Sequence, residues 1–512
     1  MKRRMTARRV VRFAVPGILL AFVTSVAVSK AQPAATAKPT TKPVPRATVA
    51  PVPHLVALRM KFQDFVKDPK RLDALNKAIG VMKSRSTAVN TSADYRRSWE
   101  YWSAMHGFYG PKAQAGLLQD AINDAPASKK TFFNGLHDLT YPATPAGLAA
   151  KVWDKCEHGT LEFLTWHRMF LFYFEKTLQA SAGDPSLHLP YWDYTDPTQI
   201  QLPAQFAQPT LPGGKPNPLF DQRRRSQTVK LDPNTTNVDN LLKKTTFDSF
   251  SEELEQQPHG STHCAVGPGC PYPLMGDVPV AGTDPIFWLH HANIDRIFEC
   301  WLKLGGAVPD DLKTLPHSFL DGTGSLVTKT YATLPIDYAY DHATNCGRKP
   351  THIFKARIEG VEQVTSLAQV QGFQIKGLKS AAKLPKLKAM PVTQEAVTLS
   401  GTELVLSDIT VAGPPGVLYN VYLSTTGPNP RKQYVATISF FGMNHHGKRR
   451  TLNRNIDVTE ALTALKGTAK ETPDVQVEFE AADGTQGPQP QPESVNPVAV
   501  KVGKIQLQVR KQ

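Results

Sequence analysis

The sequence predicts a mainly α-helical domain followed by a smaller, all-β, sandwich-like domain, and two observations support this prediction. From about residue 55 to 130, apolar residues recur at three- and four-residue intervals, which is the period of a buried helix face, and further helix-like segments follow. Toward the C-terminus, short runs of β-branched and aromatic residues alternate with turn residues, which is typical of antiparallel strands. A chain of 512 residues is long enough for both domains.

The N-terminus has the layout of an export signal over residues 1–31. A basic stretch precedes an apolar run at residues 13–28, and small residues follow where a signal peptidase would cleave. The run is short for a membrane span and contains a Pro-Gly pair, so we expect no stable membrane anchor. We therefore predict a periplasmic or secreted protein, exported by the Sec route or, given Arg8-Arg9, by the twin-arginine route.

The distribution of charge argues against a nucleic-acid partner. The net charge is +15, but ten basic residues and no acidic ones lie in residues 1–54, so the rest of the chain carries only +5. A mildly basic, solvated surface accounts for that remainder. Residues 32–54, rich in Pro, Ala, Thr and Lys, are predicted to be a linker without a core of its own.

The helical domain, predicted at residues 55–349, contains three segments with clear helix patterns. Leu161–Leu178 is a long, aromatic-rich run without Gly or Pro, which predicts a buried helix. Phe247–Glu255 predicts a second helix. A third runs from Pro285, which suits a first helical turn, to Phe298.

Residues 350–394 are predicted to be a linker, because much of this stretch is rich in Lys, Ala and Pro. The β domain is predicted at residues 395–512. Its expected strands are Glu403–Leu406, Val417–Leu423, Tyr434–Phe441, Val475–Phe479 and Ile505–Val509.

Two pairs of histidines have spacings that suit a metal site. His158 and His167 are nine residues apart and would lie on opposite sides of one helix, so His158 is expected in the loop that enters the helix. His259 and His263 are four residues apart, which places both imidazoles on one helical face.

A third pair, His290-His291, lies on the predicted helix that begins at Pro285. Adjacent helical residues point about 100° apart, so only one of the two is expected to face the same site. A site made of imidazoles alone suits copper, zinc or iron.

The five cysteines are an odd number for an exported protein. In an oxidising compartment, Cys264 and Cys270 could close one loop, and Cys300 and Cys346 another. Cys156 is then left over, two residues before His158.

Longer motifs around these histidines resemble the tyrosinase and polyphenol oxidase family of type-3 copper proteins. The resemblance spans roughly residues 95–345. The motifs are Cys156-x-His158-x8-His167-Arg168, Pro190-Tyr191-Trp192-Asp193, Pro258-His259-Gly260-x2-His263 and Asp284-Pro285-Ile286-Phe287-Trp288-Leu289-His290-His291-Ala292-Asn293-x-Asp295-Arg296.

The resemblance implies a four-helix bundle in which each of two copper ions takes three histidines. For the second copper it implies His259, His263 and His291, the last in preference to His290. For the first it implies His158, His167 and one histidine upstream. We prefer His106 over the alternative His137, because a rigid helix positions a ligand better than a Gly-flanked turn.

The resemblance also suggests roles for residues beside the ligands. In some relatives a cysteine placed as Cys156 is before His158 forms a thioether to that imidazole; the alternative is a buried thiol. Phe287 resembles a gate over the second copper that can stack on a substrate ring, although it could equally be a core residue. Glu255 resembles an acidic residue that orients water and could accept a phenol proton; alternatively, it ends a solvated helix face.

A copper-dependent oxidase that uses O2 to convert o-diphenols to o-quinones is the predicted function. Gly260 stands where many monophenol hydroxylases have Asn, and Cys264 follows His263, which favours o-diphenols or o-aminophenols over monophenols. The alternatives are a true monophenol hydroxylase, a haemocyanin-like dioxygen carrier, and a zinc hydrolase or degenerate structural protein. A copper-delivery partner would suit the exported copper protein, and no oligomeric state is predicted.

The C-terminal domain has a resemblance of its own. The segment Ile438-Ser439-Phe440-Phe441-Gly442 is similar to part of the β domain that follows plant polyphenol oxidase cores. In that family the β domain can cover the entrance to the active site, and this is expected here.

Overall fold

The computed structural model describes most of the chain after residue 56. The described residues are 57–108, 147–270, 274–341, 363–386, 401–413, 415–443, 451–467, 474–487, 490–491 and 500–511. The predicted export signal and the linker that follows it lie outside them, as do His137 and Cys346.

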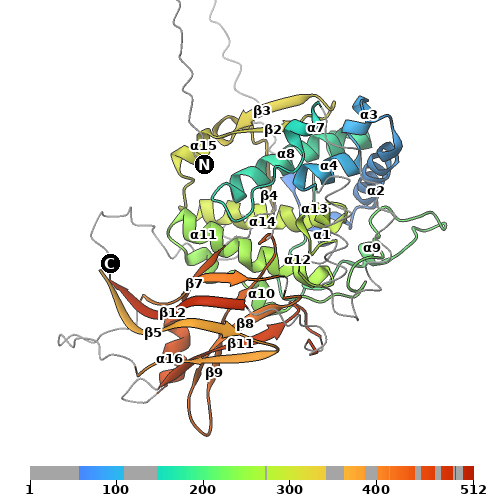
Figure 1. The fold of residues 1–512 in the computed structure, drawn as a ribbon. Helices are drawn as coiled ribbons and strands as arrows, with labels where there is room; N and C mark the ends of the chain where they lie inside the picture. Colours follow the sequence, from blue (N-terminus) through green and yellow to red (C-terminus); the bar gives the residue numbers. More distant parts are fainter. Residues whose placement is uncertain are drawn as a thin grey trace, which may run out of the picture. The chain divides into compact units, whose positions relative to one another are not determined.

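The first part of the described chain is mainly helical (Figure 1). Its α-helices are α1 (Phe62–Phe65), α2 (Pro69–Ser84), α3 (Ala93–Arg96), α4 (Trp99–His106), α7 (Ala149–Val152), α8 (Phe163–Ala182), α9 (Ala204–Ala207), α10 (Pro233–Thr236), α11 (Phe247–Leu254), α12 (Ser261–Val266), α13 (Val278–Ala281), α14 (Ile286–Lys303) and α15 (Asp310–Thr314). Within the described residues, no helix is long and apolar enough to cross a membrane.

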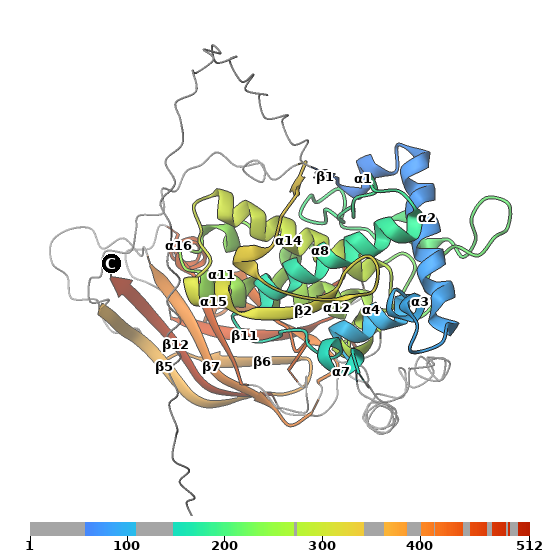
Figure 2. The ribbon, with the colours of Figure 1, turned by 90° about the horizontal axis from the view of Figure 1, so that it is seen from above.

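Figure 2 shows α4, α8 and α14 in the helical part. Within the apolar core of this part, these three helices contact one another through aromatic rings. Phe174 of α8 stacks on Trp288 of α14 with centroids 3.4 Å apart. The α4 rings of Trp99 and Trp102 contact this pair, Trp99 at 5.8 Å from Trp288 and Trp102 at 5.7 Å from Phe174. Burying four large rings in one cluster stabilises the core through burial of apolar area and fixes the relative positions of the three helices.

A buried ionic cluster joins the two ends of the helical part. Strand β1 (Ala57–Arg59) pairs in parallel with β4 (Tyr338–Tyr340). From β1, Arg59 Nε lies 2.9 Å from Glu175 of α8. Tyr338 donates a 2.7 Å hydrogen bond to Asp295 of α14. Burial alone would raise the pKa of Glu175, but the Arg59 charge lowers it to about 2, so the carboxylate stays ionised.

The C-terminal part is a sandwich of two four-stranded antiparallel sheets with a shared apolar core. One sheet has the order β10 (Leu452–Asp457), β7 (Thr402–Val411), β12 (Val500–Lys511) and β5 (Gln363–Ile375). The other has the order β6 (Lys379–Lys383), β11 (Val475–Ala482), β8 (Leu418–Thr425) and β9 (Lys432–Ile438). A short helix, α16 (Thr459–Lys466), lies against β8 and β9. A separate hairpin of β2 (Pro316–Leu320) and β3 (Leu326–Thr330) belongs to the helical part.

The predicted fold class, a mainly α domain followed by an all-β domain, is confirmed. The predicted linker at residues 350–394 is wrong in part, because β5 and β6 lie within it. β5 pairs with β12 along its length, and β6 pairs with β11. Gln- and Lys-rich segments have weak strand propensity, but pairing with neighbouring strands overrides it.

Candidate dinuclear metal centre

The histidines expected for the first copper come together from two helices and a loop. His106 is the last residue of α4, His158 lies in the loop before α8, and His167 lies in the first turns of α8. Their ring centroids are 5.1 Å apart for His106 and His158, and 5.2 Å apart for His158 and His167. Ser98 caps α4 by accepting a hydrogen bond from Tyr101, so His106 stands on an anchored helix.

The histidines expected for the second copper come from α12, α14 and the irregular turn before α12. His259 lies in a π-type turn (Glu255–Gly260) and His263 in α12, with ring centroids 4.7 Å apart. His291 of α14 brings its Nε2 to 3.2 Å from Nε2 of His263. Its ring also stacks on His167 at 4.8 Å, so His291 lies between the two sets.

His290 also reaches this region, although the sequence analysis expected only one member of the pair to face it. Its ligand nitrogen lies within 4.8 Å of those of His259, His263 and His291. Its other ring nitrogen, Nδ1, lies 2.9 Å from the hydroxyl of Tyr194. The structure therefore brings seven histidines to one buried site.

Backbone carbonyls orient four of the imidazoles through Nδ1. The pairs are His106 with Val278 at 2.9 Å, His167 with Phe163 at 2.7 Å, His259 with Glu255 at 2.9 Å and His263 with Met275 at 2.7 Å. A carbonyl can only accept, so each Nδ1 carries the proton and each Nε2 presents a lone pair. This is the usual arrangement around metal-bound histidines.

Burial keeps five of these histidines neutral, which is the form that binds metal. It lowers the pKa of His259 to about 3 and lowers the pKa values of His167, His263, His290 and His291 as well.

The donor set fits copper. Among the described residues, Nε2 of His167 and of His259 are buried with no hydrogen-bond partner. Such atoms are costly in a core unless something binds them. The clusters in which ligand atoms lie within 4.8 Å of one another contain histidines and Cys156, with no carboxylate, which suits a soft or borderline metal rather than magnesium or calcium.

Cys156 lies beside the first histidine set. It is buried, and its Sγ is 3.2 Å from Nδ1 of His158. The expected Cys264–Cys270 disulfide is present, with Cα atoms 5.0 Å apart. Cys300 is also disulfide-bonded, and its expected partner, Cys346, lies outside the described residues.

Phe287 is fully buried between the two histidine sets. Its ring centroid lies 4.2 Å from that of His291 and 4.7 Å from that of His106. These contacts fit a packing residue that touches both sets, and its role as a substrate gate stays a prediction.

Glu255 is buried, so the alternative of a solvated helix face is wrong for this residue. Its carboxylate accepts a 2.6 Å hydrogen bond from the amide of Gly159, next to His158, while its own carbonyl accepts from His259. Glu255 thus connects the loop of one histidine set to the turn of the other. The solvated-face alternative failed because Glu255 packs against the loop that carries His158, a contact that helical periodicity does not reveal.

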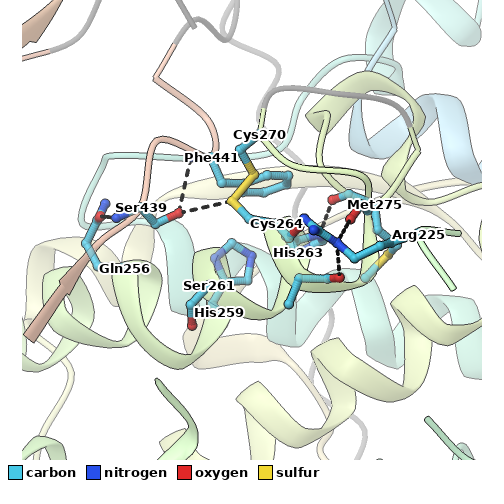
Figure 3. Close-up of a disulfide and its surroundings, with 12 residues drawn as sticks. Arg225, Gln256, His259, Ser261, His263, Cys264, Cys270, Met275, Ser439 and Phe441 are labelled. Atoms are coloured by element: carbon cyan, nitrogen blue, oxygen red, sulfur yellow. Dashed lines mark hydrogen bonds between the residues drawn. A yellow bond between two sulfur atoms is a disulfide. The ribbon is translucent and has the colours of Figure 1, made fainter. Parts of the chain in front are cut away.

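The aromatic residue closest to the second histidine set was not among the predicted site residues. Phe441, just after β9, stacks on His263 with centroids 3.9 Å apart and planes at 8° (Figure 3). It also lies 5.4 Å from His259 and 5.5 Å from His158. The signal in the sequence was the resemblance of residues 438–442 to a β domain that can cover the active site, which did not single out Phe441; the following Gly442 adopts a φ of 78°.

Polar contacts hold the β domain against the turn that carries His259. Gln257 Oε1 accepts hydrogen bonds from the amide of Thr437 at 2.9 Å and the hydroxyl of Tyr434 at 3.1 Å. Arg225 donates to the carbonyls of Cys264, Ala265 and Gly267 at the end of α12 and pairs with Asp483 of the β domain at 2.7 Å.

The central part of the chain matches a known family. The model described as the common central domain of tyrosinase matches residues 96–221 and 209–304. A tyrosinase of Hahella sp. (strain CCB-MM4), HcTyr1, is 29% identical over 290 residues, which cover 49% of this chain and 56% of that protein. A chloroplastic polyphenol oxidase of Malus domestica is 30% identical over 204 residues, covering 32% and 33%. The chain thus matches between a third and about half of the length of these relatives.

Among solved structures, latent apple tyrosinase is similar over both the helical and the β parts. The TM-score is 0.55 at 18% sequence identity, and the match covers 89% of this chain and 98% of that one. This likeness supports the fold.

Proposed function

Because the chain belongs to the tyrosinase and polyphenol oxidase family, we propose that it is an exported oxidase with two copper ions that uses dioxygen to convert o-diphenols to o-quinones. The observation that carries the proposal is the convergence of two sets of imidazoles in one buried site, four of them oriented by backbone carbonyls.

His106, His158 and His167 would hold the first copper, and His259, His263 and His291 the second. When bound, the two ions would pass electrons from the diphenol to dioxygen. The buried aromatic side chains around the histidines would limit the entry of water to the site.

Two protons must leave a diphenol for each pair of electrons. Glu255 lies at the junction of the two histidine sets and is the carboxylate we propose as acceptor for the first proton. The hydrogen bond from Gly159 would hold this carboxylate in position.

Gly260 and Cys264 favour o-diphenols, or o-aminophenols, over monophenols in this proposal. Cys264 is tied to Cys270 directly after His263, so its side chain is not available to a substrate. Gly260 provides no side-chain amide that could hold a water beside the second copper.

We further propose a thioether between Cys156 and His158. Replacing an S–H and a ring C–H bond by a C–S bond releases two protons and two electrons, with dioxygen as the oxidant. The 3.2 Å separation of Sγ and Nδ1 supports this link. We expect the peptide containing both residues to be lighter by two hydrogens in mass spectrometry after copper loading in air. An unmodified mass would exclude the crosslink.

The β domain would inhibit the enzyme by covering the site. Phe441 occupies the face of His263 on which a phenolic ring would stack, and it is buried there. The fold of this chain, including the β domain, is similar to that of a solved structure described as latent.

A substrate panel on the copper-loaded protein tests the function. We expect oxidation of 4-tert-butylcatechol and catechol, slower oxidation of 2-aminophenol, and the slowest reaction with tyrosine. Faster reaction with tyrosine would instead support a monophenol hydroxylase. Reversible oxygen binding without turnover, or zinc in place of copper, would overturn the proposal. The Phe441→Ala protein should be assayed in parallel, so that inhibition is not mistaken for inactivity.

A further inference from the structure

Gly260, the residue after His259, lies against the β domain. Its φ of −63° and ψ of −33° are helical, so the backbone does not require glycine. The surroundings leave little room for a side chain: a Cβ at this position would lie 2.5 Å from Oγ and 3.0 Å from Cβ of Ser439, and 3.1 Å from the carbonyl oxygen of Glu255. The missing side chain therefore leaves the space that Ser439 occupies.

Ser439 is held at this point by three contacts (Figure 3). Its amide donates to Gln256 Oε1 at 3.3 Å. Its Oγ lies 3.6 Å from Sγ of Cys264, which the disulfide to Cys270 keeps in place. The same Oγ accepts a hydrogen bond from the amide of Phe441 at 3.2 Å. Ser439 thus connects the surface of the second histidine set to the residue that covers it.

Both positions that follow a histidine of this set contact the same serine. Gly260 follows His259 and Cys264 follows His263, and each lies against Ser439. Further along the segment, a Cβ on Gly442 would lie 3.3 Å from Cβ of His158, so the cover continues onto the first set.

We infer that Gly260 is the docking point for the β domain: by accepting Ser439, it keeps Phe441 stacked on His263 and holds the enzyme in its inhibited form. The inference rests on the proposed inhibition by the β domain. It gives Gly260 a role in regulation that is separate from any influence on the choice of phenol.

Gly260→Ala in the full-length, copper-loaded protein tests the inference. The added methyl group overlaps Ser439, so the segment should be displaced and the rate of 4-tert-butylcatechol oxidation should rise about fivefold or more. Gly80→Ala is the matched control, because nothing lies within 4 Å of a Cβ at that position in α2. It should leave the rate unchanged.

The same substitution in a Phe441→Ala background shows how Gly260 acts. If Gly260 works by docking the segment that carries Phe441, Gly260→Ala should add little once that ring is absent. An undiminished increase in the Phe441→Ala background would mean that residue 260 acts on the chemistry itself and would overturn the inference.

Hydrogen exchange provides a readout that does not depend on activity. In the metal-free protein, the amides of Ser439 and Phe441 should exchange faster in Gly260→Ala than in the wild type or in Gly80→Ala. If Phe441→Ala activates the enzyme but Gly260→Ala changes neither exchange nor rate, this inference fails and the inhibition stands. If Phe441→Ala does not activate, the proposed inhibition itself fails.

Discussion

Replacing His291 with alanine should reduce the copper content from two ions per chain to about one and abolish the oxidation of catechol. His291 contributes a nitrogen 3.2 Å from that of His263 and lies between the two histidine sets. Without it, the second ion would keep only two of its three imidazoles, and the loss of one ligand costs a metal site much of its affinity.

His290→Ala is the matched control, since it removes the same side chain one position earlier in α14. Nδ1 of His290 is engaged by Tyr194, and we expect its imidazole to position neighbouring rings rather than to bind metal. This variant should keep two copper ions by metal analysis. If His290→Ala loses an ion and His291→Ala does not, the assignment of the third ligand must be reversed. In the same assay, His106→Ala should lose the first copper ion. If this variant still binds two copper ions, His137 becomes the candidate for the third ligand of the first copper.

Replacing Phe441 with alanine in the full-length protein should raise the rate of 4-tert-butylcatechol oxidation about tenfold to a hundredfold. Burial of a Phe side chain contributes about 1.5–3 kcal/mol, and ring stacking adds about 0.5–1.5 kcal/mol. Losing both should open the site in a much larger fraction of molecules. The increase should appear without a change in copper content.

A control for Phe441→Ala must truncate an aromatic ring of the same domain away from the site. Phe373 of β5 meets that need, because its contact is with Phe479, at 5.6 Å, within the sandwich. Phe373→Ala should lower the melting temperature of the β domain with little change in rate at temperatures where that domain stays folded. Equal rates for wild type and Phe441→Ala would show that the ring does not block substrate.

The helices could be predicted well from the sequence because their signals are local. Leu161–Leu178 was expected to be helical, and all of it from Phe163 onward lies in α8; Pro285 does precede α14. The predicted strand at 475–479 lies within β11. The linker prediction failed at β5 and β6, because their pairing partners β12 and β11 lie about 100 residues away or more. Such pairing is not visible in a local pattern.

The residues of the candidate site also fall into two groups, those predicted from local spacing and those that depend on long-range contacts. His259 and His263 follow from a four-residue spacing, and His158 was placed in a loop by helical geometry alone. The sequence left open whether His106 or His137 completes the first set, and the structure brings His106 to the site while His137 lies outside the described residues. The buried setting of Glu255 could not be predicted, because it depends on a contact with Gly159, 96 residues earlier in the chain.

By itself, the sequence determined the family motifs, the chemistry of the imidazole donors and the succession of an α and a β domain, because these depend on residue type and local spacing. Only the tertiary structure decided what lies against the donors. Phe441 and Ser439 reach His263 and Gly260 across more than 170 positions of sequence. That contact arises from the packing of two domains, and side-chain packing across a domain boundary has no period that a sequence could display.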